Sequence, residues 1–300
     1  MLQLPLIHAS DTPLLHASLQ ALLWLGANGF LFLLPLAVFA IDRRLGVRLV
    51  LVFALSVVIN SLLKNLLALP RPQELGSDAF GFGEFGFPSS HAQLATVFWG
   101  MIALHLRHWL VTLLALFMVL ATSAAPLLLQ LHFPRDIVGG LALGIGTLLL
   151  VWRYQQRAES TLLARGPQIQ LATALAITLA CWLLAGFYLN DLLLTGSIGF
   201  FLGSALAAIA HPHDAIHPHS LLWRGLRYIG GMVLVMLMVA ALQRLNAHLT
   251  LSSTLASSIT MAILGGWLVG GAPTLLDFLT ISFGGHADPH HPDDETPSGG

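Results

Sequence analysis

Charged side chains are the first thing that this sequence lacks. Only 9% of its 300 residues are Asp, Glu, Lys or Arg, and 56% are hydrophobic, whereas a soluble domain has roughly 25% charged residues. The mean hydropathy is +0.80, which excludes an ordinary soluble protein and indicates an integral membrane protein. The net charge is −1, so we expect no nucleic-acid partner.

Cysteine is almost absent as well. Cys181 is the single cysteine, which excludes a disulfide within the chain, and we interpret it as a small buried apolar residue. No basic residue precedes the first apolar run, so no cleavable signal peptide is expected. Strand-length alternation is also missing, and we therefore expect helices to satisfy the backbone within the bilayer.

Long apolar runs are what the sequence has in abundance. Because a spanning helix needs about 20 mostly apolar residues, the sequence predicts an all-α polytopic bundle of about nine transmembrane helices. The expected spans are 14–41, 49–69, 91–106, 109–131, 137–152, 169–189, 192–210, 228–243 and 255–276. They divide the chain into a five-helix core (1–155), a polar linker (156–168), a four-helix C-terminal bundle (169–285) and a polar tail (286–300).

The distribution of Lys and Arg predicts an orientation. Nine of the thirteen fall on one side of this layout, which is expected to be the cytoplasm. The C-terminus is then cytoplasmic, and the protein is expected in a bacterial inner membrane. The exceptions on the opposite, periplasmic side are Lys64, Arg71, Arg135 and Arg244.

Three polar segments converge on that opposite face. "KNLLALPRP" (64–72) ends the second span, "PSSH" (88–91) opens the third, and "HFPRD" (132–136) joins the fourth and fifth. A cation within a membrane is costly and usually serves a function, and an Arg fork beside an ammonium suits a phosphate group. The start of a helix at "PSSH" offers backbone N–H groups to the same anion.

His132 and Asp136 lie four residues apart in the third segment. A carboxylate that accepts a hydrogen bond from one ring nitrogen fixes the tautomer and leaves the other nitrogen free for attack. Taken singly, a His and an Asp are most often a solvated turn. Two histidines, an aspartate and two cations on one face indicate a catalytic site.

The ordered set of motifs closely resembles the type 2 phosphatidic acid phosphatase superfamily, which also includes vanadium haloperoxidases. The motifs are K-x6-R-P from Lys64, then P-S-S-H (88–91), then H-x3-D from His132. They come in the family order and cover about residues 14–155. The resemblance implies a metal-independent phosphatase, without a cofactor, that acts on lipid phosphates or diphosphates.

The resemblance also implies the catalytic roles. His132 is the nucleophile that forms a phosphohistidine, Asp136 orients and polarises it, and His91 is the general acid that protonates the leaving oxygen. These roles agree with the needs of phosphoryl transfer, namely an in-line nucleophile, an acid and cations on the equatorial oxygens.

Phosphate binding is assigned by the same resemblance. Lys64 and Arg71 hold the phosphoryl oxygens, and backbone N–H groups around Ser89 and Ser90 complete the cradle. Ser90 stands where many members have glycine.

One departure concerns the third motif, which usually begins Ser-Arg. This sequence has Ala125 and Pro126 at those positions, so a phosphate-binding arginine is missing. A charged hydrogen bond contributes roughly 1.5–3 kcal/mol, which corresponds to about 10- to 150-fold in rate. A slower enzyme, an altered substrate and an inactive protein are all compatible with this loss. Arg135 is a candidate to replace the arginine from another backbone position.

The predicted function is hydrolysis of a lipid phosphate at the periplasmic face. Undecaprenyl diphosphate, phosphatidic acid and phosphatidylglycerol phosphate are the expected substrates, and "GFPSSHAQ" favours the isoprenoid diphosphate. A phosphotransferase would use the same residues. The other alternative is a non-catalytic lipid-binding or lipid-translocating protein, suggested by Pro126 and the four extra spans.

The second half offers fewer signals. "GSIGFFLGSALA" (196–207) has small residues at helical spacing, which permits close helix packing or dimerisation. The C-terminal bundle is thus expected to widen a lipid groove, to form a homo-oligomer interface or to pass lipid. The His-rich runs 211–220 and 286–294 are interpreted as polar loops, and no metal site is predicted.

Overall fold

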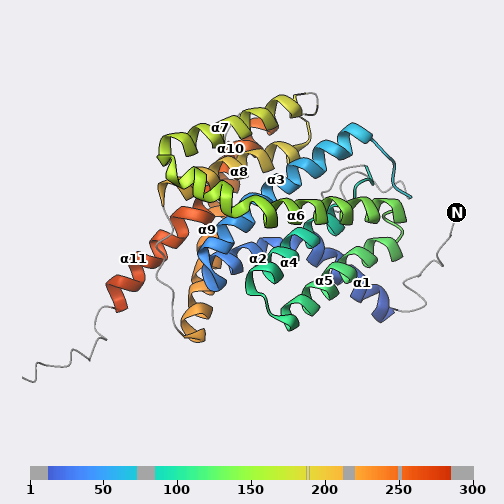
Figure 1. Ribbon diagram of the computed structural model, residues 1–300, viewed down its shortest axis with the longest axis horizontal. Coiled ribbons are helices and arrows are strands. Elements are labelled where there is room, and N and C mark those ends of the chain that lie inside the picture. The colour runs from blue at the N-terminus through green and yellow to red at the C-terminus, as the bar shows by residue number, and fades with distance from the viewer. Residues whose placement is uncertain are drawn as a thin grey trace, which may run out of the picture.

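The computed structural model describes residues 13–72, 85–186, 188, 190–211, 220–248 and 252–284, and these ranges contain helices and no strand (Figure 1). The predicted all-α class is therefore confirmed for them. Most of the run 211–220 and all of 286–294 lie outside the described residues. The helices are α1 (Pro13–Asn28), α2 (Phe30–Leu36), α3 (Arg43–Leu67), α4 (Ser90–Leu106), α5 (Trp109–Leu128), α6 (Pro134–Ala164), α7 (Gly166–Ala185), α8 (Leu192–Ala210), α9 (Leu221–His248), α10 (Ser253–Gly266) and α11 (Ala272–Gly284), with π-helical turns η1 (Ala37–Ile41) and η2 (Trp267–Gly271).

Seven helices in the described part of the chain are long and apolar enough to cross a membrane, or eight if the bent pair at the N-terminus is one span. The helix α4 has 17 residues, somewhat short of the roughly 20 that a perpendicular span needs. Helices of this length and composition suggest a membrane protein. The count of nine spans stays a prediction.

Two expected segments differ from the structure. The first span, 14–41, is bent by 53° at Gly29, where a Cβ would collide with the Leu25 carbonyl. The polar stretch from residue 156, expected as a linker, continues α6 as far as Ala164. This stretch is rich in good helix formers, and Arg48 of α3 forms an ion pair with Glu159 there.

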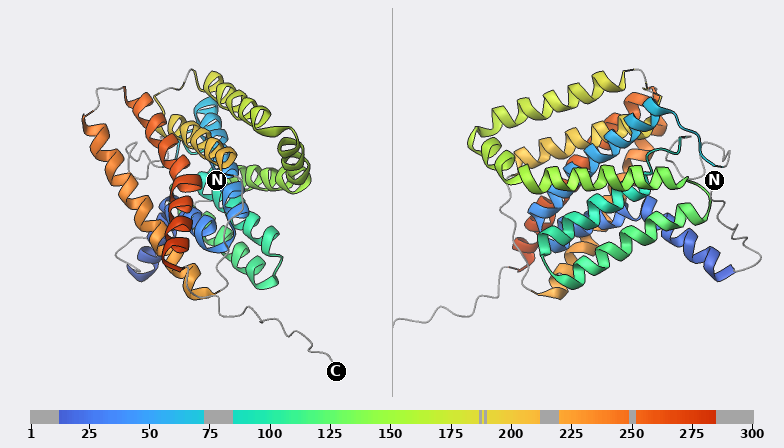
Figure 2. Two further views of the ribbon diagram at one scale, coloured as in Figure 1. Left: turned by 90° about the vertical axis from the view of Figure 1, so that its left-hand side faces the viewer. Right: turned by 45° about the vertical axis from the view of Figure 1, so that its right-hand side comes forward.

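The helix α3 lies between the two halves of the molecule (Figures 1 and 2). On one side, Phe53 packs against Phe30 of α2, whose ring also contacts Phe98 of α4, with ring centroids 4.6 and 5.4 Å apart. On the other side, Val58 belongs to an apolar cluster with Leu194 of α8. The first and second halves are therefore packed on one shared helix.

The small-residue stripe of α8 packs against α10 of the same chain. A Cβ at Gly199 would collide with the Ser258 carbonyl, and one at Gly203 with that of Ala262. The Ser258 hydroxyl donates to the Thr195 carbonyl at 3.0 Å. Small residues permit this close backbone approach between membrane helices, so the stripe serves packing within the chain.

A charged cluster joins the halves at the end of α3 that bears Arg43. The Asp277 carboxylate of α11 lies 2.6 Å from an Arg227 nitrogen and 3.7 Å from an Arg43 nitrogen. Arg43 also donates to the Val269 carbonyl of η2 at 3.4 Å. Two arginines share one carboxylate here, so this end of the bundle carries net positive charge.

Candidate active site

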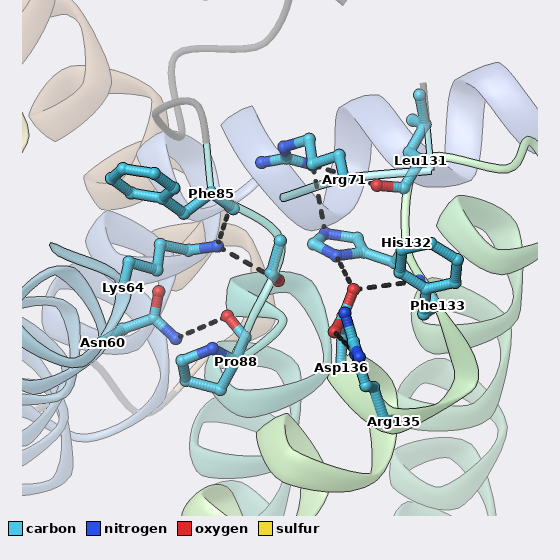
Figure 3. A network of polar contacts seen from close by, with 11 residues as sticks. Asn60, Lys64, Arg71, Phe85, Pro88, Leu131, His132, Phe133, Arg135 and Asp136 are labelled. Carbon is cyan, nitrogen blue, oxygen red and sulfur yellow. Dashed lines mark hydrogen bonds and ion pairs between the residues drawn. The ribbon is translucent and has the colours of Figure 1, made fainter. Parts of the chain in front are cut away.

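The three predicted segments meet at the end of α3 that bears Lys64 (Figure 3). Lys64 lies in the last turn of α3, which ends at Ala68 in a left-handed conformation (φ 47°) before the two prolines that flank Arg71. An isolated β-bridge pairs Pro70 with Phe85, so the chain after α3 lies beside the chain that leads to "PSSH". The side chains at the junction are at most 4% exposed, namely those of Lys64, Ser89, Ser90, His91, His132 and Asp136.

His132 precedes α6 and is held by Asp136 in the first turn of that helix. Its Nδ1 lies 3.4 Å from Asp136 Oδ2, which also accepts the Phe133 backbone N–H at 2.9 Å. Pro134 occupies the first turn, where a missing N–H costs nothing. The spacing of four residues thus places the carboxylate directly against the imidazole, as the sequence pattern predicted.

Arg71 faces the other nitrogen of the His132 ring. Its Nη1 lies 3.3 Å from His132 Nε2 and 3.3 Å from the Leu131 carbonyl. A guanidinium only donates hydrogen bonds, so this contact requires Nε2 to be the acceptor. We assign the Nδ1–H tautomer on this network, with the proton toward Asp136 and the Nε2 lone pair directed into the site.

Burial also fixes the charge state of His132. It lowers the pKa of His132 to about 4, although the hydrogen bond with Asp136 acts in the opposite direction; the nearby charges of Arg71 and Lys64 lower it further. Burial lowers the pKa of Arg71 as well, against the attraction of Asp136. His132 is therefore neutral near pH 7.

His91 comes to the same point from the first turn of α4. The His91 and His132 ring centroids are 6.2 Å apart, with planes inclined by 71°. A Cβ at Gly26 of α1 would lie 3.1 Å from His91 Cδ2, so glycine lets α1 pack directly on this ring. The two histidines are separated by 41 positions in the chain and adjacent in the fold.

Lys64 binds the backbone that leads into "PSSH". Its Nζ donates to the carbonyls of Phe85 at 2.9 Å and Gly86 at 3.4 Å. A Cβ at Gly86 would lie 2.8 Å from Asp136 Oδ2, so this backbone also lies against the Asp136 carboxylate. An ammonium has three N–H donors. The two carbonyl contacts use two of them, which leaves the third N–H for an anion.

The serines combine two kinds of polar group. The Ser89 N–H donates to the Asp136 carbonyl at 2.9 Å, so one backbone donor of the predicted cradle is already engaged. The Ser89 and Ser90 hydroxyl oxygens are buried and have no hydrogen-bond partner among the described residues. Buried hydroxyls without partners require an explanation, and a bound anion would supply the acceptor.

A buried amide network was missed at the sequence level. Asn60 Nδ2 donates to Gln93 Oε1 at 2.7 Å and to the Pro88 carbonyl at 3.3 Å. Gln93 Nε2 in turn donates to the Ser56 carbonyl at 3.1 Å. The network ties α3 to α4 directly beneath "PSSH". The signal was available, because Asn60 and Gln93 are amides in otherwise apolar spans.

The two positions at which the third motif usually has Ser-Arg lie in the last turns of α5. Pro126 and Ala125 are buried in the last turns of α5, and the Pro126 carbonyl accepts the Leu131 N–H at 2.8 Å. Arg135 lies elsewhere: its Nε is 3.6 Å from Asp136 Oδ1, and its guanidinium stacks 4.9 Å from the Phe133 ring centre. Its side chain is 55% exposed.

Comparison with known proteins supports the resemblance seen in the motifs. Residues 45–160 match the model of the PAP2 superfamily, a segment that contains every predicted site residue, and the resemblance is thereby confirmed. A protein of Dictyostelium discoideum named "Probable sphingosine-1-phosphate phosphatase" is 29% identical over 169 residues. That alignment covers 49% of this chain, and the chain spans only 41% of the relative's length. No solved structure matches.

The superfamily match and the name of the relative are the two findings that bear on function. Groups of three or more His, Cys, Asp or Glu side chains that could hold a metal ion do not occur in the described ranges. The described site brings together two histidines, one carboxylate and two cations.

Proposed function

We propose that this chain is a membrane lipid phosphatase that works through a phosphohistidine at residue 132. The observation that carries the proposal is the position of His132, between Asp136 at Nδ1 and Arg71 at Nε2, with His91 6.2 Å away. This arrangement provides a neutral nucleophile with a fixed tautomer, a cation for the phosphoryl oxygens and a second imidazole for the leaving group.

The reaction has two steps. In the first, His132 Nε2 attacks phosphorus in line and the bond from phosphorus to the lipid oxygen breaks. His91, protonated once the anionic phosphate is bound beside it, gives its proton to that oxygen. In the second, neutral His91 takes a proton from water, the water oxygen attacks phosphorus, and the bond to Nε2 breaks to release phosphate. Arg71 and Lys64 stabilise the charge on the equatorial oxygens throughout.

The membrane arrangement belongs to the same proposal. With nine spans, Arg43, Arg48 and Arg107 lie at the end of the bundle opposite the site, and the enrichment of Lys and Arg in cytoplasmic loops supports a cytoplasmic location for that end. The active site then faces the periplasm of a bacterial inner membrane, with the C-terminus in the cytoplasm. A five-helix core to residue 155 carries the chemistry, and residues 169–285 form the second bundle.

The test is phosphate release by detergent-purified protein in the presence of a chelator. The substrates are undecaprenyl diphosphate, phosphatidic acid, phosphatidylglycerol phosphate and sphingosine-1-phosphate, the last suggested by the name of the relative. His132→Ala is expected to lower the rate by at least about 10³-fold. His105→Ala, at the exposed far end of α4, is the matched control and is expected to keep the wild-type rate.

The alternatives give different results in the same assay. Phosphate recovered on an acceptor lipid or sugar instead of in solution would identify a phosphotransferase. The non-catalytic alternative is favoured by Pro126, which replaces an arginine of the third motif. It predicts no release from any lipid, with lipid movement across vesicles that His132→Ala leaves unchanged.

A further inference from the structure

An apolar cavity of about 300 Å³ lies between the two halves of the molecule. Its walls include Val57 of α3, Leu94 of α4, Leu193 and Phe200 of α8, Val235 of α9 and Leu268 of η2. The polar side chains among its lining residues are those of Asn28 and Ser197. A water-soluble polar ligand would find almost no hydrogen-bond partners here.

The cavity is built by both halves of the chain. Lining residues of α2, α3 and α4 come from the first half, and those of α8, α9, α10 and η2 come from the second. The second set lies outside residues 45–160, the segment that matches the superfamily.

Two lining residues of the cavity lie close to the candidate site, although no residue of that site lines the cavity. On α4, Leu94 follows His91 by three residues, which is a rise of about 4.5 Å along the helix. On α8, Leu193 follows Asp191, and Asp191 accepts a hydrogen bond from Asn65 at 2.8 Å, one position after Lys64. Two of its walls thus reach the phosphate-binding end of the molecule.

From there the cavity runs along α3 toward the middle of the bundle. Its lining includes Phe53, eleven residues before Lys64, which corresponds to about 16 Å along the helix. This is about half of the roughly 30 Å hydrocarbon core of a bilayer. The far end of the lining on α3 therefore lies about one leaflet's thickness from a head group at the site.

We propose that this cavity holds one hydrocarbon chain of the lipid phosphate while its head group is at His132, so that α8 and α10 select substrates by chain length. The inference rests on the proposed phosphatase function. An apolar cavity that stays vacant destabilises a protein in proportion to its volume, and a volume at the low end for ligand pockets suits a single chain.

The test fills the wall that the second half provides. Ser197→Leu places an apolar side chain into the cavity, and Ala210→Leu makes a similar change at the exposed end of the same helix. Initial rates are measured with alkyl monophosphates from hexyl to hexadecyl. The wild type is expected to show kcat/KM rising with chain length. Ser197→Leu is expected to lower kcat/KM for hexadecyl phosphate about 10-fold more than for hexyl phosphate, while Ala210→Leu keeps the wild-type profile.

Two results would overturn the proposal while the phosphatase function stands. One is a wild-type kcat/KM that does not depend on chain length, and the other is a Ser197→Leu profile that follows the wild type. Either would mean that the substrate chain lies elsewhere and that bulk lipid fills the cavity.

A second measurement does not depend on turnover. His132→Ala is irradiated with a hexadecyl phosphate that carries a diazirine at the chain end, and the labelled peptides are mapped. Label on α8 and α10 that excess hexadecyl phosphate removes supports the cavity, even if no lipid is hydrolysed. Label confined to the exposed surface of α5 contradicts it.

Discussion

The two halves of the molecule bury different kinds of residue. The first half buries polar side chains at the candidate site, and the second buries small residues where its helices pack. Where α3, α4 and α6 meet, the buried side chains are polar, among them Lys64, His91 and Asp136. Where α8 meets α10, the buried positions are small, and Gly199 and Gly203 lie directly against backbone carbonyls. Buried polar groups are costly unless they are paired or used, whereas glycine brings helices together without that cost.

The largest effect that this comparison predicts is the loss of His91, the proposed leaving-group acid. His91→Ala removes a residue that packs against Gly26 and faces His132, and general acid catalysis contributes roughly 10²- to 10⁴-fold. We expect kcat to fall by that range with a lipid monophosphate, measured as initial phosphate release. His105→Ala on the same helix is the control, and equal losses in both variants would show that the effect is not catalytic.

The next effect is a pH dependence of stability that belongs to the first half alone. The folded pKa of His132 is about 4, below the unfolded value of about 6.5, so the unfolded state binds more protons between these values. Stability should therefore be fully present above pH 6.5 and should fall as the pH approaches 4.

The difference between variants isolates this contribution. Between pH 6.5 and 4, the free energy of unfolding of His132→Gln should fall by about 3 kcal/mol less than that of the wild type. The measurement is unfolding in detergent at several pH values. His105→Gln should follow the wild type. Parallel curves for all three proteins would mean that His132 is not buried as a neutral imidazole.

A smaller effect is expected from the packing half. Gly203→Leu places a side chain against the Ala262 carbonyl, and overpacking typically destabilises by about 1–3 kcal/mol. We expect a lower midpoint of thermal unfolding and little change in the rate per folded molecule with hexyl phosphate. Gly225→Ala is the control, because a Cβ there has no heavy atom within 4 Å. An unchanged midpoint for Gly203→Leu would mean that α8 and α10 are not closely packed.

The smallest effect concerns Arg135. Its exposed side chain pairs with Asp136 at 3.6 Å, and exposed ion pairs contribute about 0–1 kcal/mol. Arg135→Ala should therefore reduce kcat/KM by no more than about fivefold. A loss of about 100-fold would instead show that Arg135 replaces the arginine that Pro126 displaced.

The sequence predicted the features that depend on spacing along the chain. The helical class and the superfamily resemblance are confirmed. The contact between His132 and Asp136 follows from their spacing of four residues at the start of α6. Contacts between distant residues were not predictable in this way. The Asn60–Gln93 bond and the engagement of the Ser89 N–H by Asp136 depend on how α3, α4 and α6 pack, which no local pattern specifies.

The roles of the site residues and the domain boundaries stay predictions. The bend at Gly29 was missed because 14–41 was interpreted as one span from its hydropathy, and hydropathy does not register a change of direction. The continuation of α6 through polar residues was missed because a polar stretch was interpreted as a linker. A helix can continue into water beyond the hydrocarbon region when its residues are good helix formers.

The shared cavity also has a consequence for biosynthesis. All residues of the phosphate site have been made once residue 136 is added, but the last wall residue of the cavity is Leu268. At 5–20 residues per second, the ribosome needs roughly 7–26 s to make the intervening 132 residues. During that interval the nascent chain contains every residue of the candidate site while the C-terminal wall is still being synthesised, so the proposed selection by chain length would be acquired last.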